Sequence, residues 1–160
     1  MPDHDKLTEI AISLMRGDRL FFSKCPLFAV TAYLRHKGCC AYCGRKDLLN
    51  SPEGLFAIQE LDHLLPFSVY PQLDSDPLNR VPACRYCNQL KRGWDPNDPP
   101  VYEKTSTEPL NEQQHLELVG RTQTRVGELR ERHRKAFSGA RTLWESALAR
   151  YDTLMLAGHL

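Results

Sequence analysis

Two cysteine pairs constrain this chain more than any other feature of its sequence. The first pair is Cys40 and Cys43 and the second is Cys84 and Cys87, which gives the spacing C-x2-C-x40-C-x2-C. Two residues between thiolates allow a tight turn to direct both sulfurs at one ion, and two such turns complete a tetrahedral four-sulfur zinc site. We therefore predict a structural zinc ion held by these four cysteines.

Other uses of the cysteines stay open at this level. A redox pair would need only one Cys-x-x-Cys motif, usually inside a strand–helix unit. Cys39 adjoins Cys40 and allows a second ligand register, although the two-residue spacing favours Cys40. Cys25 fits the role of a small buried apolar residue better than that of a ligand.

Composition places the chain among ordinary globular proteins. Its 160 residues are 41% hydrophobic and 26% charged, which is enough for one core with a smaller appendage. The net charge of +1 lacks the bulk positive charge of a strong nucleic-acid binder, so nucleic-acid contacts must come from a local patch. No secretory signal pattern and no apolar run of membrane-spanning length are visible, so we expect a cytoplasmic protein that keeps its thiols reduced.

Proline placement predicts four segments. Residues 1–25 form an N-terminal helical segment ending its helix near Gly17, because apolar residues recur there at helical spacing. Residues 26–94 suit short strands and loops, with short apolar runs at 55–58 and 61–65. Residues 95–109 are a Pro-rich connection, and residues 110–160 form a helical C-terminal segment.

The C-terminal segment contains no proline, and apolar residues follow helical spacing from Val126 to Met155. This pattern predicts one long helix or a helical hairpin, with Gly120 or Gly127 as the point of a break. Its apolar stripe has two interpretations. It either mediates a homodimer or packs on the N-terminal helix.

Between the cysteine pairs lie residues that suit hydrolytic chemistry. A strand ends at Asp62 and His63 before Pro66, which leaves a carboxylate and an imidazole on opposite faces of the strand end. Asn79 follows in a turn-rich stretch, and Asn88 comes directly after the last cysteine of the second pair. Taken separately, each of these residues has an ordinary structural interpretation.

Taken together, the order CxxC, DHxxP, N, CxxCNxxK resembles the HNH endonucleases of the ββα-metal fold. The resemblance runs from about Cys40 to Lys91 or Gly93, roughly a third of the chain. It implies an α+β fold with a small ββα-metal core, in which a β-hairpin is followed by a helix and zinc clamps the ends. The N-terminal helix and the long C-terminal helix or hairpin would flank this core.

The resemblance also implies roles for single residues. His63 falls at the family's general base, and Asn79 at the middle residue that steadies the hairpin and the histidine. Asp62 falls at a ligand of the catalytic divalent ion. Asn88 falls at the final motif position, where it replaces the histidine of the family's name. The resemblance therefore implies hydrolysis of DNA phosphodiester bonds.

The residue chemistry agrees with these roles. A histidine with a pKa of roughly 6.5 can take a proton from water near neutral pH. Asp62 and Asn88 offer the oxygen ligands that Mg²⁺ or Mn²⁺ prefers. The alternative is a non-catalytic zinc-binding module that uses a basic helix for nucleic acid or the long helix for a partner protein.

Charge is unevenly distributed around the motif. Residues 48–79 carry five acidic residues and no Lys or Arg, whereas residues 80–92 carry four basic residues and no acid. We expect these four to contact the nucleic-acid backbone, DNA or RNA, next to the catalytic ion. They are Arg80, Arg85, Lys91 and Arg92.

Overall fold

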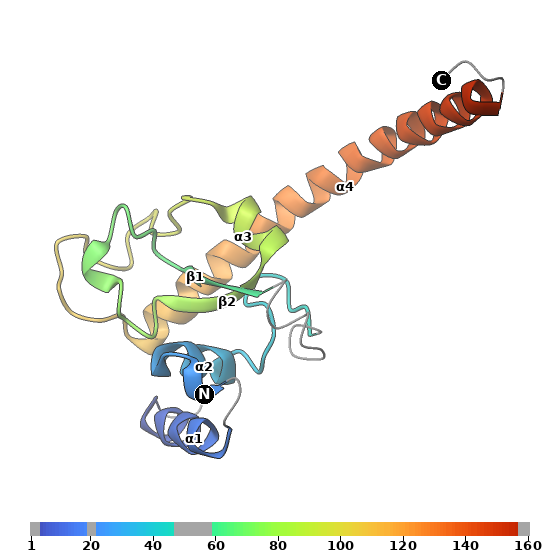
Figure 1. The fold of residues 1–160 in the computed structure, drawn as a ribbon. Helices are drawn as coiled ribbons and strands as arrows, with labels where there is room; N and C mark the ends of the chain where they lie inside the picture. The colour runs from blue at the N-terminus through green and yellow to red at the C-terminus, as the bar shows by residue number, and fades with distance from the viewer. Residues whose placement is uncertain (1–3, 19–21, 47–58, 157–160) are drawn as a thin grey trace. The chain divides into compact units, whose positions relative to one another are not determined.

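Figure 1 shows the computed structural model, which describes residues 4–18, 22–46 and 59–156. Helices and a two-stranded sheet confirm the predicted α+β class. The apolar run at 55–58 lies outside the described residues. The elements in chain order are α1 (His4–Gly17), the 3-10 turn η1 (Phe22–Lys24), α2 (Leu27–Arg35), β1 (Gln59–His63), the 3-10 turn η4 (Pro71–Leu73), β2 (Arg80–Cys84), α3 (Arg85–Lys91) and α4 (Glu112–Leu156).

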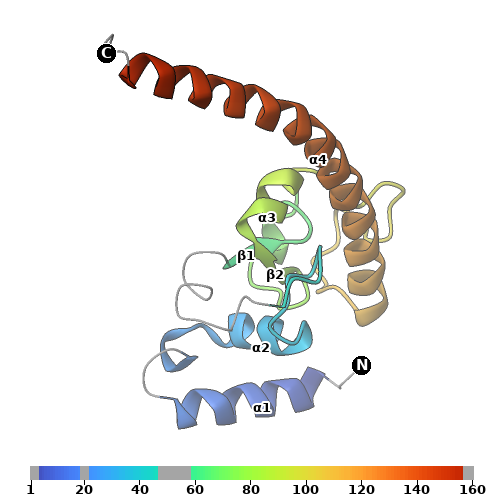
Figure 2. The same ribbon diagram turned by 90° about the vertical axis from the view of Figure 1, so that its right-hand side faces the viewer.

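The centre of the fold is an antiparallel hairpin followed by a helix. β1 pairs with β2 so that Glu60 lies opposite Ala83 and His63 lies opposite Arg80. α3 begins at Arg85, directly after the last residue of β2, and packs on the hairpin (Figure 2). The strand–strand–helix order predicted from the resemblance is therefore present.

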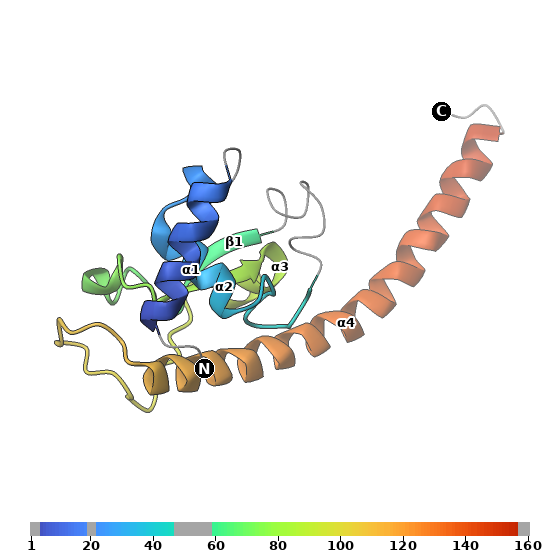
Figure 3. The same cartoon turned by 90° about the horizontal axis from the view of Figure 1, so that it is seen from below.

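Apolar residues of α4 share one core with this hairpin, and α2 packs against β2. Val81 and Ala83 of β2 are fully buried and belong to one core with Leu118 and Val126 of α4. α1 buries Leu7 at its contact with α2, and the two helices lie side by side (Figure 3). None of the helices within the described ranges combines the length and the apolar character that a bilayer crossing requires.

α4 is a single helix that passes through Gly120 and Gly127 without a break. Of the two predicted alternatives, one long helix is therefore correct and the helical hairpin is wrong. Residues 1–126 form one compact unit, and residues 127–160 form a second. The described part of the second unit is helix alone, so its apolar side chains have no core of their own.

A polar cluster is buried where α2 meets the start of α4. Arg35 pairs with Glu112 at 3.4 Å, and the rings of His36 and His115 are 5.5 Å apart. His115 is fully buried, and its Nδ1 lies 2.6 Å from the carbonyl oxygen of Leu78. Burial, His115 and the nearby Arg35 charge lower the pKa of His36 to about 4, because a second buried positive charge is unfavourable there.

This pKa predicts acid-sensitive stability. His36 takes up a proton near pH 6.5 in the unfolded chain but only near pH 4 in the folded protein. As pH falls from about 6.5 toward about 4, protons therefore bind preferentially to the unfolded chain, and the free energy of unfolding falls. We expect His36 to account for a loss of about 2 kcal/mol between about pH 7 and about pH 5. Urea unfolding of zinc-loaded protein should show a weaker pH dependence in His36→Asn.

The matched control is His133→Asn, because His133 is exposed on α4. It should keep the pH dependence of the wild type. Equal pH dependence in His36→Asn and the wild type would contradict the assignment, and zinc content measured at each pH separates histidine protonation from metal loss.

Candidate active site

The four paired cysteines meet at one point. Their sulfurs all lie within 4.8 Å of one another, and the Sγ atoms of Cys43 and Cys84 are 4.0 Å apart. Cys84 ends β2 and Cys87 lies in the first turn of α3, so the hairpin and helix supply two ligands directly. The Sγ of Cys39 instead lies 3.4 Å from the carbonyl oxygen of Lys37. Cys40, and not Cys39, is therefore the cysteine that joins the cluster.

Backbone geometry explains how the first pair reaches this point. The amide of Gly44 donates to the carbonyl of Cys40 at 2.9 Å, and Gly44 adopts a φ of 69°, which favours glycine. The amide of Ala41 donates to the carbonyl of Pro82 at 2.8 Å and so fastens this turn to β2. Residues 41 positions apart in sequence are thereby brought together.

The cluster fits zinc. Sulfurs at about 2.3 Å from a tetrahedral zinc ion lie about 3.8 Å apart, close to the observed spacing. Hydrogen bonds from Cys40 and Cys87 lower the pKa of Cys84 to about 3, whereas hydrogen bonds with Cys40 and Cys84, together with burial, raise the pKa of Cys87. Four thiolate ligands leave no open position, so such an ion would be structural.

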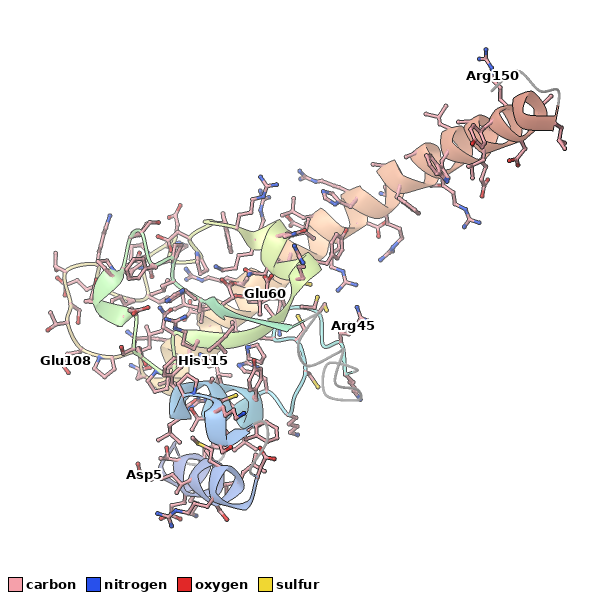
Figure 4. All side chains as sticks on the ribbon, in the orientation of Figure 1. Asp5, Arg45, Glu60, Glu108, His115 and Arg150 are labelled. Carbon is pink, nitrogen blue, oxygen red and sulfur yellow. The ribbon has the colours of Figure 1, made fainter. Side chains whose placement is uncertain are left out.

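A second polar group lies between β1 and α3, on the strand face that carries Glu60 and Asp62. Glu60, labelled in Figure 4, accepts a hydrogen bond from Nδ2 of Asn88. The Asp62 carboxylate is 12% exposed, and its Oδ2 accepts from Tyr42 at 2.6 Å and from Lys91 at 3.1 Å. The predicted metal ligands Asp62 and Asn88 therefore belong to one polar face with a second carboxylate.

Tyr42 and Lys91 fix the position of the Asp62 carboxylate. Burial and the Asp62 charge raise the pKa of Tyr42 well above its usual range, so the phenol remains a donor. The ammonium of Lys91 also donates to the carbonyl of His63 at 2.8 Å. This lysine thus connects the Asp62 side chain with the backbone of the next residue.

The structure corrects part of the expected basic surface. Lys91 is 2% exposed, because its ammonium is directed at Asp62 and the His63 carbonyl, so its placement on an exposed phosphate-binding face is wrong. Arg80 is mostly covered and pairs with Asp74, and its guanidinium lies over the ring of Phe28 at 5.5 Å. The exposed members of the set are Arg85 and Arg92.

His63 lies on the opposite face of β1, as the alternation of the strand predicts. Its Nε2 is 2.9 Å from Oδ1 of Asp74, and Asp74 also accepts hydrogen bonds from Arg80. The hydrogen bond from His63 and the charge of Arg80 lower the pKa of Asp74, so this carboxylate is ionised and acts as the acceptor. Nε2 therefore carries the proton, and Nδ1 carries the lone pair.

Asn79 closes the long connection between the two strands. Its side chain is fully buried, accepts from the amide of Leu65 at 2.7 Å and donates to the carbonyls of Leu65 and Leu73 at 3.2 Å. The backbone carbonyl of Asn79 accepts from the amide of Leu64 at 2.8 Å. These bonds fix the loop that carries Asp74 toward His63.

Three residues of this site were missed by the sequence reasoning. Glu60 could have been found, because a residue two positions before Asp62 shares its strand face. Tyr42 lies between the two cysteines of the first pair, and the cysteine spacing does not indicate that its hydroxyl donates to Asp62. Asp74 lies 11 residues after His63 in an irregular loop, where no sequence period connects the two.

Comparison with known proteins agrees with this arrangement. The HNH endonuclease family model matches residues 40–92. Protein ea31 of Escherichia phage lambda is 33% identical over 54 residues, a match that covers 34% of this chain and 15% of that protein. The chain therefore spans a small part of this relative's length. No solved structure matches the chain.

The cysteine cluster predicts a zinc-dependent fold. Cys84→Ser should lose most of the bound zinc and the cooperative thermal transition, because structural zinc contributes about 10–16 kcal/mol and whole domains are stable by about 5–15 kcal/mol. Elemental analysis of the zinc-to-protein ratio and a thermal melt measure both effects.

Cys25→Ser and Cys39→Ser are matched controls, because neither cysteine belongs to the cluster. Both should retain zinc and the melting transition. Full zinc retention in Cys84→Ser, or loss in Cys39→Ser, would overturn the ligand assignment.

Proposed function

We propose that the protein is a metal-dependent endonuclease that hydrolyses DNA phosphodiester bonds, and the match of residues 40–92 to the HNH endonuclease family model supports this proposal. The observation that carries the proposal is the arrangement around β1. His63 is held by an ionised carboxylate on one side of the strand, and two carboxylates and an amide gather on the other. Phosphodiester hydrolysis requires both kinds of group.

His63 acts as the general base in this proposal. Its Nδ1 takes a proton from the attacking water, and Asp74 stabilises the imidazolium that forms, because its carboxylate accepts the hydrogen bond from Nε2. Arg80 keeps Asp74 ionised and oriented. Asp74 is thus a positioning residue for His63, and Asn79 holds the loop between them.

Asp62 and Asn88 are the proposed ligands of a divalent ion such as Mg²⁺ or Mn²⁺, with the Glu60 carboxylate next to Asn88. The donor set fits, because these ions bind through one or two carboxylates, amide oxygens and water. Oδ2 of Asp62 is occupied by Tyr42 and Lys91, which leaves Oδ1 as the candidate ligand atom. When bound, the ion would neutralise charge on the phosphate and on the leaving 3′-oxygen.

The substrate backbone is proposed to contact Arg85 and Arg92, the exposed basic residues of the α3 region. Guanidinium groups suit phosphate oxygens because they donate paired hydrogen bonds. Arg80 and Lys91 then contribute indirectly, through Asp74 and Asp62. A duplex DNA and an RNA of the same length, tested in parallel, distinguish the two substrates.

The second candidate function is a zinc-binding module without catalysis. It is favoured by the ion pair between Lys91 and Asp62, because a lysine ammonium that neutralises the carboxylate reduces its attraction for a cation. Such a module would bind zinc and nucleic acid but would not hydrolyse phosphodiester bonds.

Plasmid cleavage separates these functions. Zinc-loaded protein with Mg²⁺ or Mn²⁺ should nick supercoiled DNA, and His63→Ala should lower the rate by about 10²–10⁴-fold because the water loses its base. His133→Ala is the control, since His133 is exposed on α4 and outside the site. Absence of cleavage by the wild type, or equal cleavage by His63→Ala, would refute the proposal.

Asp74→Asn tests the positioning role. We expect kcat to fall by about 10–100-fold, the usual effect of losing an orienting partner, while zinc content and melting temperature stay unchanged. Asp74→Glu should recover part of the activity, because it restores an anionic acceptor. Asp152→Asn, an exposed change on α4, is the matched control. A loss of kcat that accompanied unfolding would indicate a purely structural role.

A further inference from the structure

The second unit of the chain exposes large apolar side chains on a single helix. Phe137, Trp144 and Tyr151 are 67%, 65% and 51% exposed. An isolated helix gains little stability in water without a packed face. Exposed aromatic residues in such a row indicate a surface that is covered in the assembled protein.

The spacing of these residues is that of a coiled-coil seam. The three aromatic residues are seven positions apart, and Ala140 and Ala147 follow the first two at a distance of three. We call these five residues the aromatic–alanine stripe. A repeat of seven with apolar residues at the first and fourth positions keeps one face of a helix against a partner helix.

We propose that residues 135–156 form an antiparallel two-helix dimer with a second copy of this chain. With the two-fold axis between positions 145 and 146, Trp144 lies opposite Ala147 of the second copy, and Tyr151 lies opposite its Ala140. Every large residue in these layers then meets a small one. A parallel dimer would instead place Trp144 opposite Trp144 of the second copy and each alanine opposite the same alanine. The tryptophan layer would then be too crowded and the alanine layers would leave cavities.

Charge also selects the antiparallel arrangement. Residues 127–141 carry five basic and two acidic residues, whereas residues 142–156 carry one basic and two acidic residues. In the antiparallel arrangement, residues 135–141 of one copy lie opposite residues 150–156 of the other, so the basic halves of the two copies lie at opposite ends of the dimer. Parallel helices would place the two basic halves side by side, which is unfavourable.

The stripe supplies enough surface for a stable dimer. Each aromatic side chain buries about 150–250 Å², so the six in a dimer bury at least about 900 Å². Leu143 and Leu148, which are exposed and flank the stripe, bring the total toward the roughly 1,200 Å² of a specific interface. Nucleic acid is a poorer occupant, because Arg134, Lys135 and Arg141 already pair with glutamates of the same helix.

Sedimentation velocity of the zinc-loaded full chain over a concentration series tests the dimer. The wild type should dimerise, and Trp144→Glu should raise the dissociation constant by roughly 30-fold or more, as the loss of a central aromatic contact does. Leu156→Glu is the matched control, because Leu156 is 91% exposed and lies off the stripe, and it should leave the dimer intact.

Two further variants test the pairing of large and small residues. Ala147→Trp should weaken the dimer, because tryptophan would then face Trp144 of the second copy. The double variant Trp144→Ala with Ala147→Trp should restore it, because large again faces small. A monomer at every concentration, or a dimer insensitive to Trp144→Glu, would overturn the proposal and would favour packing of the stripe within one chain.

Spin labels distinguish the two directions. In a background of Cys25→Ser and Cys39→Ser, labels at Ser146→Cys should lie under about 25 Å apart, because they flank the axis. Labels at Arg132→Cys should lie about 40 Å apart, at 1.5 Å per residue. Equal short distances at both positions would show a parallel dimer and refute the pairing. These measurements do not involve DNA cleavage, so their outcome is independent of the proposed nuclease.

Discussion

The meeting of four cysteine sulfurs is the interaction on which the rest of the site depends. It joins the turn of Cys40 and Cys43 to the end of β2 and the start of α3. The turn brings Tyr42 against Asp62, and the α3 end presents Asn88 to Glu60. A structural ion at the sulfurs would therefore fix Tyr42 and Asn88, two of the donors that orient the carboxylates of β1.

Asp62 shows how this arrangement balances two demands. A mostly buried carboxylate is costly unless charge and hydrogen bonds compensate it, and Lys91 with Tyr42 provides both. Both donors act on Oδ2. The compensation therefore uses one carboxylate oxygen and leaves Oδ1, the proposed metal ligand, without a donor from either residue.

Much of this architecture was accessible from the sequence because its signals are local or periodic. The four-cysteine cluster follows from motif spacing, α1 ends at Gly17 as its apolar repeat predicts, and α4 follows from a proline-free helical pattern. Lys91 was misplaced because residues 80–92 carry four basic residues and no acid, and only the approach of β1 to α3 buries it against Asp62. Asp74 was missed for the same reason, since the loop closed by Asn79 brings it to His63.

The two faces of β1 are chemically distinct but mechanically coupled. Alternation along the strand directs Glu60 and Asp62 to one face and His63 to the other, so the proposed base and the proposed metal ligands, although adjacent in sequence, do not compete for the same space. Lys91 reaches both positions, through the Asp62 carboxylate and the His63 carbonyl. A shift of α3 would therefore disturb the ligand through a salt bridge and the base through its backbone at the same time. Because α3 begins between two zinc-cluster cysteines, the geometry of the base depends on the same four sulfurs as that of the ligands.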